Sequence, residues 1–207
     1  MGPSSLGQLD VSGPPRPSIG SRRGHAPRRD LVPDWAELPP THANIDDLDP
    51  FARVLATTDG TVTEILEAWA GDQVSVGWVS QRRADLESPV PTLHAVPGTP
   101  VLRRDELLIG TRTGRALLYA ESLIALERLP TLVSDGLIAG TRPIGRLLRE
   151  SRLETFREIL CLRREPAGQV AADFDARADD PFVMRSYAIV AGGLPLMLIA
   201  EKFPGRR

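Results

Sequence analysis

The chain has 207 residues, of which 42% are hydrophobic and 25% are charged, and its formal net charge is −2. These values are ordinary for one globular domain with a core, and they exclude a protein that binds nucleic acid or anionic membranes through strong positive charge. No apolar run is long enough to cross a bilayer, and no export signal is recognisable. We therefore predict a cytoplasmic protein whose partners include neither nucleic acid nor a membrane.

Scarce residue types exclude several kinds of site. There is one cysteine, Cys161, one lysine, Lys202, and three histidines. This composition excludes a disulfide framework, leaves one lysine for any Schiff-base chemistry, and argues against a Ser-His-Asp triad or a histidine-rich metal site. No phosphate-binding glycine motif is present. We expect no metal and no cofactor, and a small anionic substrate handled by carboxylates, arginines and backbone dipoles. We also expect a monomer or weak dimer.

The N-terminal part of the chain differs in composition from the rest. Residues 1–44 are rich in Pro, Gly, Ser and Arg. Such a segment cannot bury enough apolar surface to offset its ordering entropy. We predict a disordered extension over 1–44 and one folded domain over 45–207.

The first part of the folded domain predicts two helices and a strand. Pro50 follows Asp49 at the start of a short helix. A second, amphipathic helix runs to Ala70, and Thr61 and Glu64 have the spacing of a capping box. The segment 74–81 alternates as a strand does.

The remainder predicts mostly antiparallel strands. Two strands over 101–110 and 115–126 are joined by a turn, and a second hairpin over 184–203 turns at Gly192-Gly193. Helices are expected over 131–140 and from Pro143 onward, and 153–164 is favoured as a strand over a helix. The fold class is α+β, an antiparallel sheet of about six strands with helices covering one face.

Glu201 is the first candidate for chemistry. Along the last strand it shares a face with the apolar side chains of Met197, Ile199 and Phe203. A carboxyl group that faces an apolar interior has a raised pKa unless it is paired, which is how general acids and bases are tuned. The alternative is a structural glutamate paired with an arginine.

Three further features indicate site residues less strongly than Glu201 does. Glu121 has apolar neighbours on its own face. Arg103 and Arg104 point to opposite faces of their strand, so at most one of them lines a given pocket. The helix start after Pro143 offers the backbone N–H groups of Ile144 and Gly145 to an anion, although the pattern P-x-G by itself favours an ordinary helix start.

Together, the segments DGTVTEILEAW, LRRDELLIG, AESLIALERLP, RPIGRLL, LETFRE and RSYAIVAGGLPLMLIAEKF resemble the chorismate pyruvate-lyase family in order and spacing, more its shorter divergent branch than the ubiquinone-pathway branch. The resemblance covers Thr61 to Phe203 and includes the closing pattern G-x-P-L-x-x-x-x-E-x-F. It implies a closed internal cavity on an antiparallel sheet and elimination of pyruvate from chorismate to give 4-hydroxybenzoate, without a cofactor.

The resemblance also implies roles for residues of this chain. Arg104 matches the family's binding arginine, Ile144 its backbone contact at a helix start, Val62 an apolar contact, and Glu201 its glutamate. Arg104 and Glu201 are thus the expected catalytic residues, and all four are expected to bind substrate. Glu121 stands where the better-known branch has arginine, so it receives no catalytic role.

Two other readings stay open. The same fold serves as the effector-binding domain of some transcription regulators, which would make the protein a non-catalytic binding protein. A lyase that forms another hydroxybenzoate is the third reading, because the ring position of the hydroxyl depends on placement that a sequence does not show.

Overall fold

The computed structural model describes Trp35 and residues 43–205. Most of the predicted N-terminal extension therefore lies outside the described residues. Within it, Trp35 is buried in a hydrophobic cluster with Leu86, Leu93 and other residues, and the Ala43 N–H donates to the carbonyl of Leu162 at 2.8 Å. Ordered contacts thus begin before Ile45.

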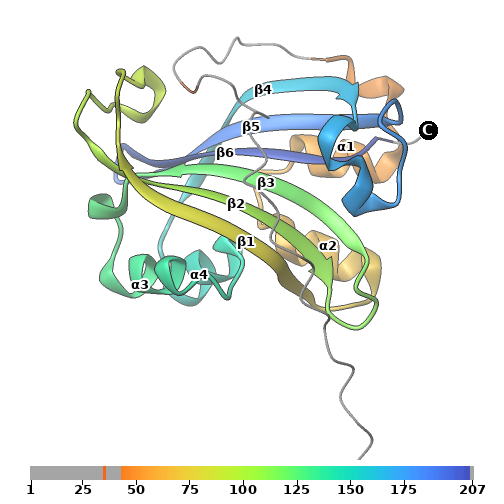
Figure 1. Cartoon of the computed structure of the whole chain (residues 1–207), viewed down its shortest axis with the longest axis horizontal. Coiled ribbons are helices and arrows are strands. Elements are labelled where there is room, and N and C mark those ends of the chain that lie inside the picture. The colour runs from red at the N-terminus through yellow and green to blue at the C-terminus, as the bar shows by residue number, and fades with distance from the viewer. Residues whose placement is uncertain (1–34, 36–42, 206–207) are drawn as a thin grey trace, which may run out of the picture.

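The strands form one antiparallel sheet in the order β1-β2-β3-β6-β5-β4 (Figure 1). Their bounds are β1 Val74–Asp85, β2 Pro100–Gly110, β3 Ala116–Ile124, β4 Phe156–Pro166, β5 Pro181–Ala191 and β6 Leu194–Pro204. The strand predictions are confirmed, including the one over 153–164. Gly192 and Gly193 both have positive φ, 57° and 79°, which the tight turn between β5 and β6 requires and which glycine adopts without strain.

The α-helices pack against one face of this sheet. They are α1 Pro50–Thr57, α2 Val62–Ala70, α3 Thr131–Ala139 and α4 Ile144–Glu150. Buried residues of all four helices form one hydrophobic cluster with β-sheet residues such as Leu118, Tyr187 and Ile199. Figure 1 shows α3 and α4 side by side. The expected fold class is confirmed.

The opposite face of the sheet has its own cluster. It contains Tyr119, Phe182 and Leu198 and is covered by loops with the short 3-10 helices η2 (Pro91–Leu93) and η4 (Gly168–Phe174). From Leu118 to Ala120 in β3, and from Met197 to Ala200 in β6, successive residues belong to the two clusters in turn, as the period of two in a strand requires. Among the residues described, no helix is long and apolar enough to cross a membrane.

One helix start differs from its prediction. The short helix α1 begins at Pro50 as predicted, and Asp49 caps it, with its Oδ1 accepting from the N–H groups of Phe51 and Ala52. Thr61, however, makes no side-chain capping bond at α2, so the predicted capping box is wrong. Glu64 instead forms an ion pair with Arg149 of α4, so its carboxylate ties the two helices together.

Candidate functional site

A small internal cavity lies between the helix-covered face of the sheet and the starts of α2 and α4. Its volume is about 30 Å³, which is far below the range of about 300–1,000 Å³ that is usual for small-molecule sites. The cavity has an apolar wall and a few ionisable groups. It is lined by Val62, Thr63, Glu106, Leu108, Leu118, Ala120, Pro143, Ile144, Gly145, Arg157, Tyr187, Ile189, Ile199 and Glu201.

The two helices meet closely at the cavity. A Cβ atom on Gly145 would lie 2.9 Å from Thr61 Cγ2 and 3.2 Å from Thr63 Oγ1, so the start of α4 can approach α2 only because residue 145 is glycine. Neither α2 nor α4 has a side-chain cap. First-turn N–H groups without caps are available to other acceptors.

Glu201 reaches the cavity from β6 and is held by two donors. Its Oε2 accepts from Arg185 Nε at 2.7 Å, and its Oε1 accepts from the Tyr187 hydroxyl at 2.8 Å. Glu201 is 5% exposed and Arg185 is fully buried, so the ion pair is shielded from solvent. The sequence left open a catalytic or a paired structural glutamate, and the structure shows a paired glutamate that also lines the cavity.

The charges around Glu201 shift the pKa values of its partners. Burial raises the pKa of the Tyr187 hydroxyl, and the charge of Glu201 raises it further, against smaller opposing effects of Arg185 and Arg157. Burial alone lowers the pKa of Arg185, but Glu201 and Tyr187 more than offset this, so the net pKa is raised. Tyr187 therefore stays protonated and donates to a carboxylate that a permanent cation accompanies.

A second buried carboxylate, Glu106 of β2, faces the same cavity. Its Oε2 accepts from Arg104 Nη2 at 2.7 Å and from Arg104 Nε at 3.2 Å. Burial raises the pKa of Glu106, the charge of Arg104 opposes this rise, and the charge of Glu201 adds to it. Two carboxylates thus share one cavity, each with its own arginine.

Arg104 is fully buried and uses its donors on the protein itself. Besides Glu106, it donates to Gln81 Oε1 at 2.9 Å, to the Leu137 carbonyl at 3.1 Å and to the Arg142 carbonyl at 3.1 Å. Arg104 therefore fastens the connection between α3 and α4 to the sheet. It lies behind Glu106, outside the lining of the cavity.

The structure places the other residues that the sequence analysis singled out either at the cavity or on the opposite face of the sheet. Glu201, Ile144 and Val62 line the cavity together. Glu121 lies on the opposite face of the sheet, because its neighbour Ala120 is the cross-strand partner of Glu201. There its Oε1 accepts from the Tyr119 hydroxyl at 3.0 Å.

Sequence reasoning missed three ionisable residues of the cavity: Glu106, Arg157 and Tyr187. A signal existed for Glu106, since it stands two positions after Arg104 and must share its face. Arg157 of β4 contacts the cavity wall and donates from Nη1 to the Asp59 carbonyl at 2.7 Å. Its Nε is buried and has no hydrogen-bond partner among the residues described, and the same holds for Nη2 of Arg185.

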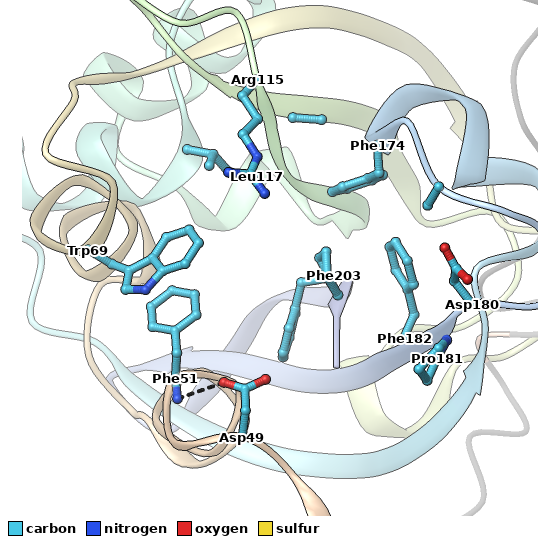
Figure 2. A pocket seen from close by; sticks show the side chains of 13 residues that line it. Asp49, Phe51, Trp69, Arg115, Leu117, Phe174, Asp180, Pro181, Phe182 and Phe203 are labelled. Atoms are coloured by element: carbon cyan, nitrogen blue, oxygen red, sulfur yellow. Dashed lines mark hydrogen bonds between the residues drawn. The ribbon is translucent and has the colours of Figure 1, made fainter. Parts of the chain in front are cut away.

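A larger hollow of about 610 Å³ lies elsewhere, and we call it the outer hollow. Figure 2 shows the stacked rings of Phe51 and Trp69 on one side of it and Phe174 and Phe182 on the other, with Phe203 between them. It shares no lining residue with the internal cavity and contains neither Glu106 nor Glu201. Size alone favours the outer hollow, but the buried carboxylates favour the internal cavity for chemistry.

Within the described part of the chain, no three Asp, Glu, His or Cys side chains gather in a way that could hold a metal ion. The chemical groups that face the internal cavity are carboxylates, an arginine, a tyrosine hydroxyl and backbone N–H groups.

Comparisons with solved structures support the fold. The chain is similar to the effector domain of PhnF from Mycobacterium smegmatis, with a TM-score of 0.53 and 18% identity, covering 72% of this chain and 90% of that one. The crystal structure of a putative GntR-family transcriptional regulator is also similar, with a TM-score of 0.51 and 13% identity, over 71% of this chain and 61% of that one. At such identities the likeness concerns the fold alone.

Comparisons with known sequences identify the family as well as the fold. The chain is 34% identical over 161 residues to a chorismate pyruvate-lyase of Mycobacterium leprae, covering 75% of each chain. It is 32% identical over 155 residues to one of Mycobacterium tuberculosis, covering 73% of this chain and 78% of that one. The family model described as "Chorismate pyruvate-lyase Rv2949c-like" matches residues 56–206, which include every residue of the internal cavity. The chain therefore belongs to the Rv2949c-like family of chorismate pyruvate-lyases.

Proposed function

We propose that this protein binds chorismate in the internal cavity and eliminates pyruvate from it, leaving 4-hydroxybenzoate. The observation that carries the proposal is the set of groups around Glu201. A buried carboxylate lines the cavity and is held by a buried arginine and a protonated tyrosine. This set suits proton transfer and charge placement on an anionic substrate.

The reaction requires the following changes. The bond between the ring carbon and the ether oxygen breaks, and the oxygen leaves with the three-carbon unit. That unit gains a proton on its methylene carbon and becomes pyruvate. The ring loses the hydrogen from the carbon that bears its hydroxyl group and becomes aromatic. In this proposal Glu201 accepts or positions that proton, and Tyr187 and Arg185 hold its carboxylate in place.

The residues expected to bind substrate differ in the kind of contact that each supplies. Val62 and Ile189 supply apolar walls for the ring, and the backbone at Ile144 supplies an N–H group for an anionic oxygen. Arg104 acts through Glu106, whose carboxylate it holds at the cavity. We therefore assign Arg104 a positioning role, which revises the direct contact that the family resemblance implies.

Chorismate is much larger than a cavity of about 30 Å³, so binding requires part of the wall to move. We propose that the connection between α1 and α2 is the part of the wall that moves. Arg185 donates to the carbonyls of Leu55 and Thr58, and Arg157 donates to that of Asp59. These three hydrogen bonds come from only two side chains. The segment can therefore move while the hydrogen bonds between the strands of the sheet stay intact.

The test is incubation of purified protein with chorismate in the presence of EDTA. We expect pyruvate and 4-hydroxybenzoate in equal amounts, because the chemistry assigned to the cavity uses only side chains and backbone. Tight binding of chorismate without turnover would support a non-catalytic binding protein. An aromatic product with its hydroxyl at another ring position would identify a different lyase.

The cytoplasmic location and the monomeric or weakly dimeric state are further parts of this proposal. They are checked by fractionation of the producing cells and by sedimentation of the purified protein. A stable higher oligomer would contradict the second expectation.

A further inference from the structure

Arg157 has a buried donor that the protein does not use. Its Nη1 bonds the Asp59 carbonyl, but its Nε has no hydrogen-bond partner among the described residues, although the side chain lines the internal cavity. A buried guanidinium N–H without an acceptor is destabilising, so an acceptor supplied by a ligand would be favoured there. Carboxylates are the acceptors that match the planar fork of arginine best.

Arg157 lies on the Glu201 side of the cavity. Its guanidinium carbon is 5.9 Å from the ring centre of Tyr187, the residue whose hydroxyl donates to Glu201. Arg185, with its own unpartnered Nη2, lies 4.8 Å from the same ring centre. Two guanidinium groups thus flank the tyrosine that positions the candidate acid or base.

Arg104 differs from Arg157 in this respect. Its Nε, Nη1 and Nη2 atoms donate to Glu106, to Gln81 and to the carbonyls of Leu137 and Arg142. A substrate carboxylate could bind Arg104 only by displacing one of these partners. Of the two arginines, Arg157 alone both lines the cavity and keeps a free donor.

We propose that Arg157 binds the carboxylate of the enolpyruvyl group of chorismate. This inference rests on the proposed function and names the residue that anchors the leaving group. The enolpyruvyl carboxylate is joined to the ether oxygen through one carbon, so it lies close to the bond that breaks. Glu201 acts at that reacting centre in the proposed mechanism, and Arg157 is the available cation beside it.

The same contact acts during the reaction. As the ring-carbon to oxygen bond breaks, its electron pair goes to the three-carbon unit, which then takes a proton on its methylene carbon. A cation held against this unit stabilises the charge that develops on it. Arg157 therefore affects both the KM for chorismate and the kcat.

The test compares substrate with product. 4-Hydroxybenzoate lacks the enolpyruvyl carboxylate, so Arg157→Gln is expected to raise the KM for chorismate at least about tenfold and to leave the Kd of 4-hydroxybenzoate within about threefold. Arg164→Gln is the matched control, because Arg164 is an exposed arginine on the same strand. It is expected to change neither constant.

Arg157→Lys keeps the charge but lacks the Nε donor, and it gives the same comparison if the glutamine variant does not fold. A smaller rise in the KM for chorismate, with product binding preserved, supports the proposal. An equal loss of chorismate and product binding would overturn it, because Arg157 would then hold the ring carboxylate or only the α1–α2 connection. Unchanged constants would overturn it as well. A wild type that releases no pyruvate would instead refute the proposed function.

Discussion

Glu201 is the residue on which the proposed chemistry depends most. Glu201→Gln keeps size and hydrogen-bonding capacity and removes the ionisable group. We expect turnover to fall by roughly two to four orders of magnitude, the usual scale for a lost general acid or base. Steady-state release of pyruvate measures this effect.

Glu121→Gln is the control for that variant. Glu121 is also a buried glutamate of the sheet, 7% exposed, but it lies on the face away from the cavity. Its turnover is expected to change much less. A folded Glu201→Gln variant with a near wild-type rate would return Glu201 to a purely structural role.

Arg104 is expected to matter for stability as well as for binding. Arg104→Ala leaves Glu106 buried without its cation and removes the bonds to the carbonyls of Leu137 and Arg142. Breaking a buried ion pair by removing one partner costs about 3–5 kcal/mol, so we expect a large fall in the free energy of unfolding together with a raised KM for chorismate. Denaturant unfolding measures the first effect.

Arg103→Ala is the comparison for Arg104. Arg103 is only half-buried and lies on the opposite face of β2. It should change stability and KM little. Equal effects at both positions would contradict the assignment of Arg104 to the inner face.

Asp105 gives a pH-dependent prediction away from the cavity. Burial raises the pKa of Asp105 from 3.8 to about 6, against opposing effects of Arg82 and Arg103. The folded state therefore binds more protons than the unfolded state between these values, and this group lowers stability as the pH rises through that window. Asp105→Asn should raise the free energy of unfolding by about 1 kcal/mol at pH 7, after allowance for solvent screening.

The gain from Asp105→Asn should disappear below pH 3.8, where the wild-type carboxyl group is protonated in both states. The exposed residue Asp85, on the neighbouring strand β1, provides the control variant Asp85→Asn, which should show no such gain. A gain of the same size at all pH values would contradict the assigned cause. Chemical denaturation across the pH range measures it.

At the scale of elements, the approach of α4 to α2 fixes the shape of the cavity. Gly145→Ala would place a Cβ atom 2.9 Å from Thr61 Cγ2, so the helices must separate. We expect weaker binding of 4-hydroxybenzoate and chorismate and a loss of about 1–3 kcal/mol in stability, as for other overpacked sites. Adding Thr61→Ser removes the methyl group in conflict and should restore much of both. A double variant no better than Gly145→Ala would contradict this packing argument.

Much of the element pattern could be predicted from the sequence. The alternation of Met197, Ile199, Glu201 and Phe203 gave the inward face of β6, and the glycine pair gave the turn before it. The partner of Glu201 could not be predicted in the same way. A simple two-residue turn at Gly192-Gly193 places Met184 opposite Glu201, but a register shift between Ile189 and Val190 places Arg185 there instead.

The position of Arg157 at the cavity could not be predicted from the sequence for a related reason. β4 is an edge strand whose pairing with β5 also shifts register, between Ile159 and Cys161. Which of its side chains meets the cavity depends on the sheet order and on this shift. Neither is encoded in the local pattern of LETFRE, so an arginine there was indistinguishable from a surface residue.

At the scale of the whole molecule, Trp35 connects a segment of unusual composition to the domain. It is 6% exposed and belongs to the cluster on the face away from the cavity. Trp35→Ala should cost about 3 kcal/mol, as for other buried aromatic residues, with little effect on turnover. Deletion of residues 1–34 should leave stability nearly unchanged, because their composition offers little apolar surface to bury. Thermal unfolding of the two variants measures both effects, and a large loss on deletion of 1–34 would contradict the second expectation.

The central claim is that the internal cavity, and not the larger outer hollow, is the site of chemistry. A crystal structure of the protein with 4-hydroxybenzoate tests this claim most directly. We predict the aromatic ring between Val62 and Ile189, with an enlarged internal cavity and a hydrogen bond between the ligand and Glu201. Binding only in the outer hollow, among Phe51, Trp69 and Phe174, with Glu201 still bonded to Arg185 and Tyr187 alone, would contradict the account.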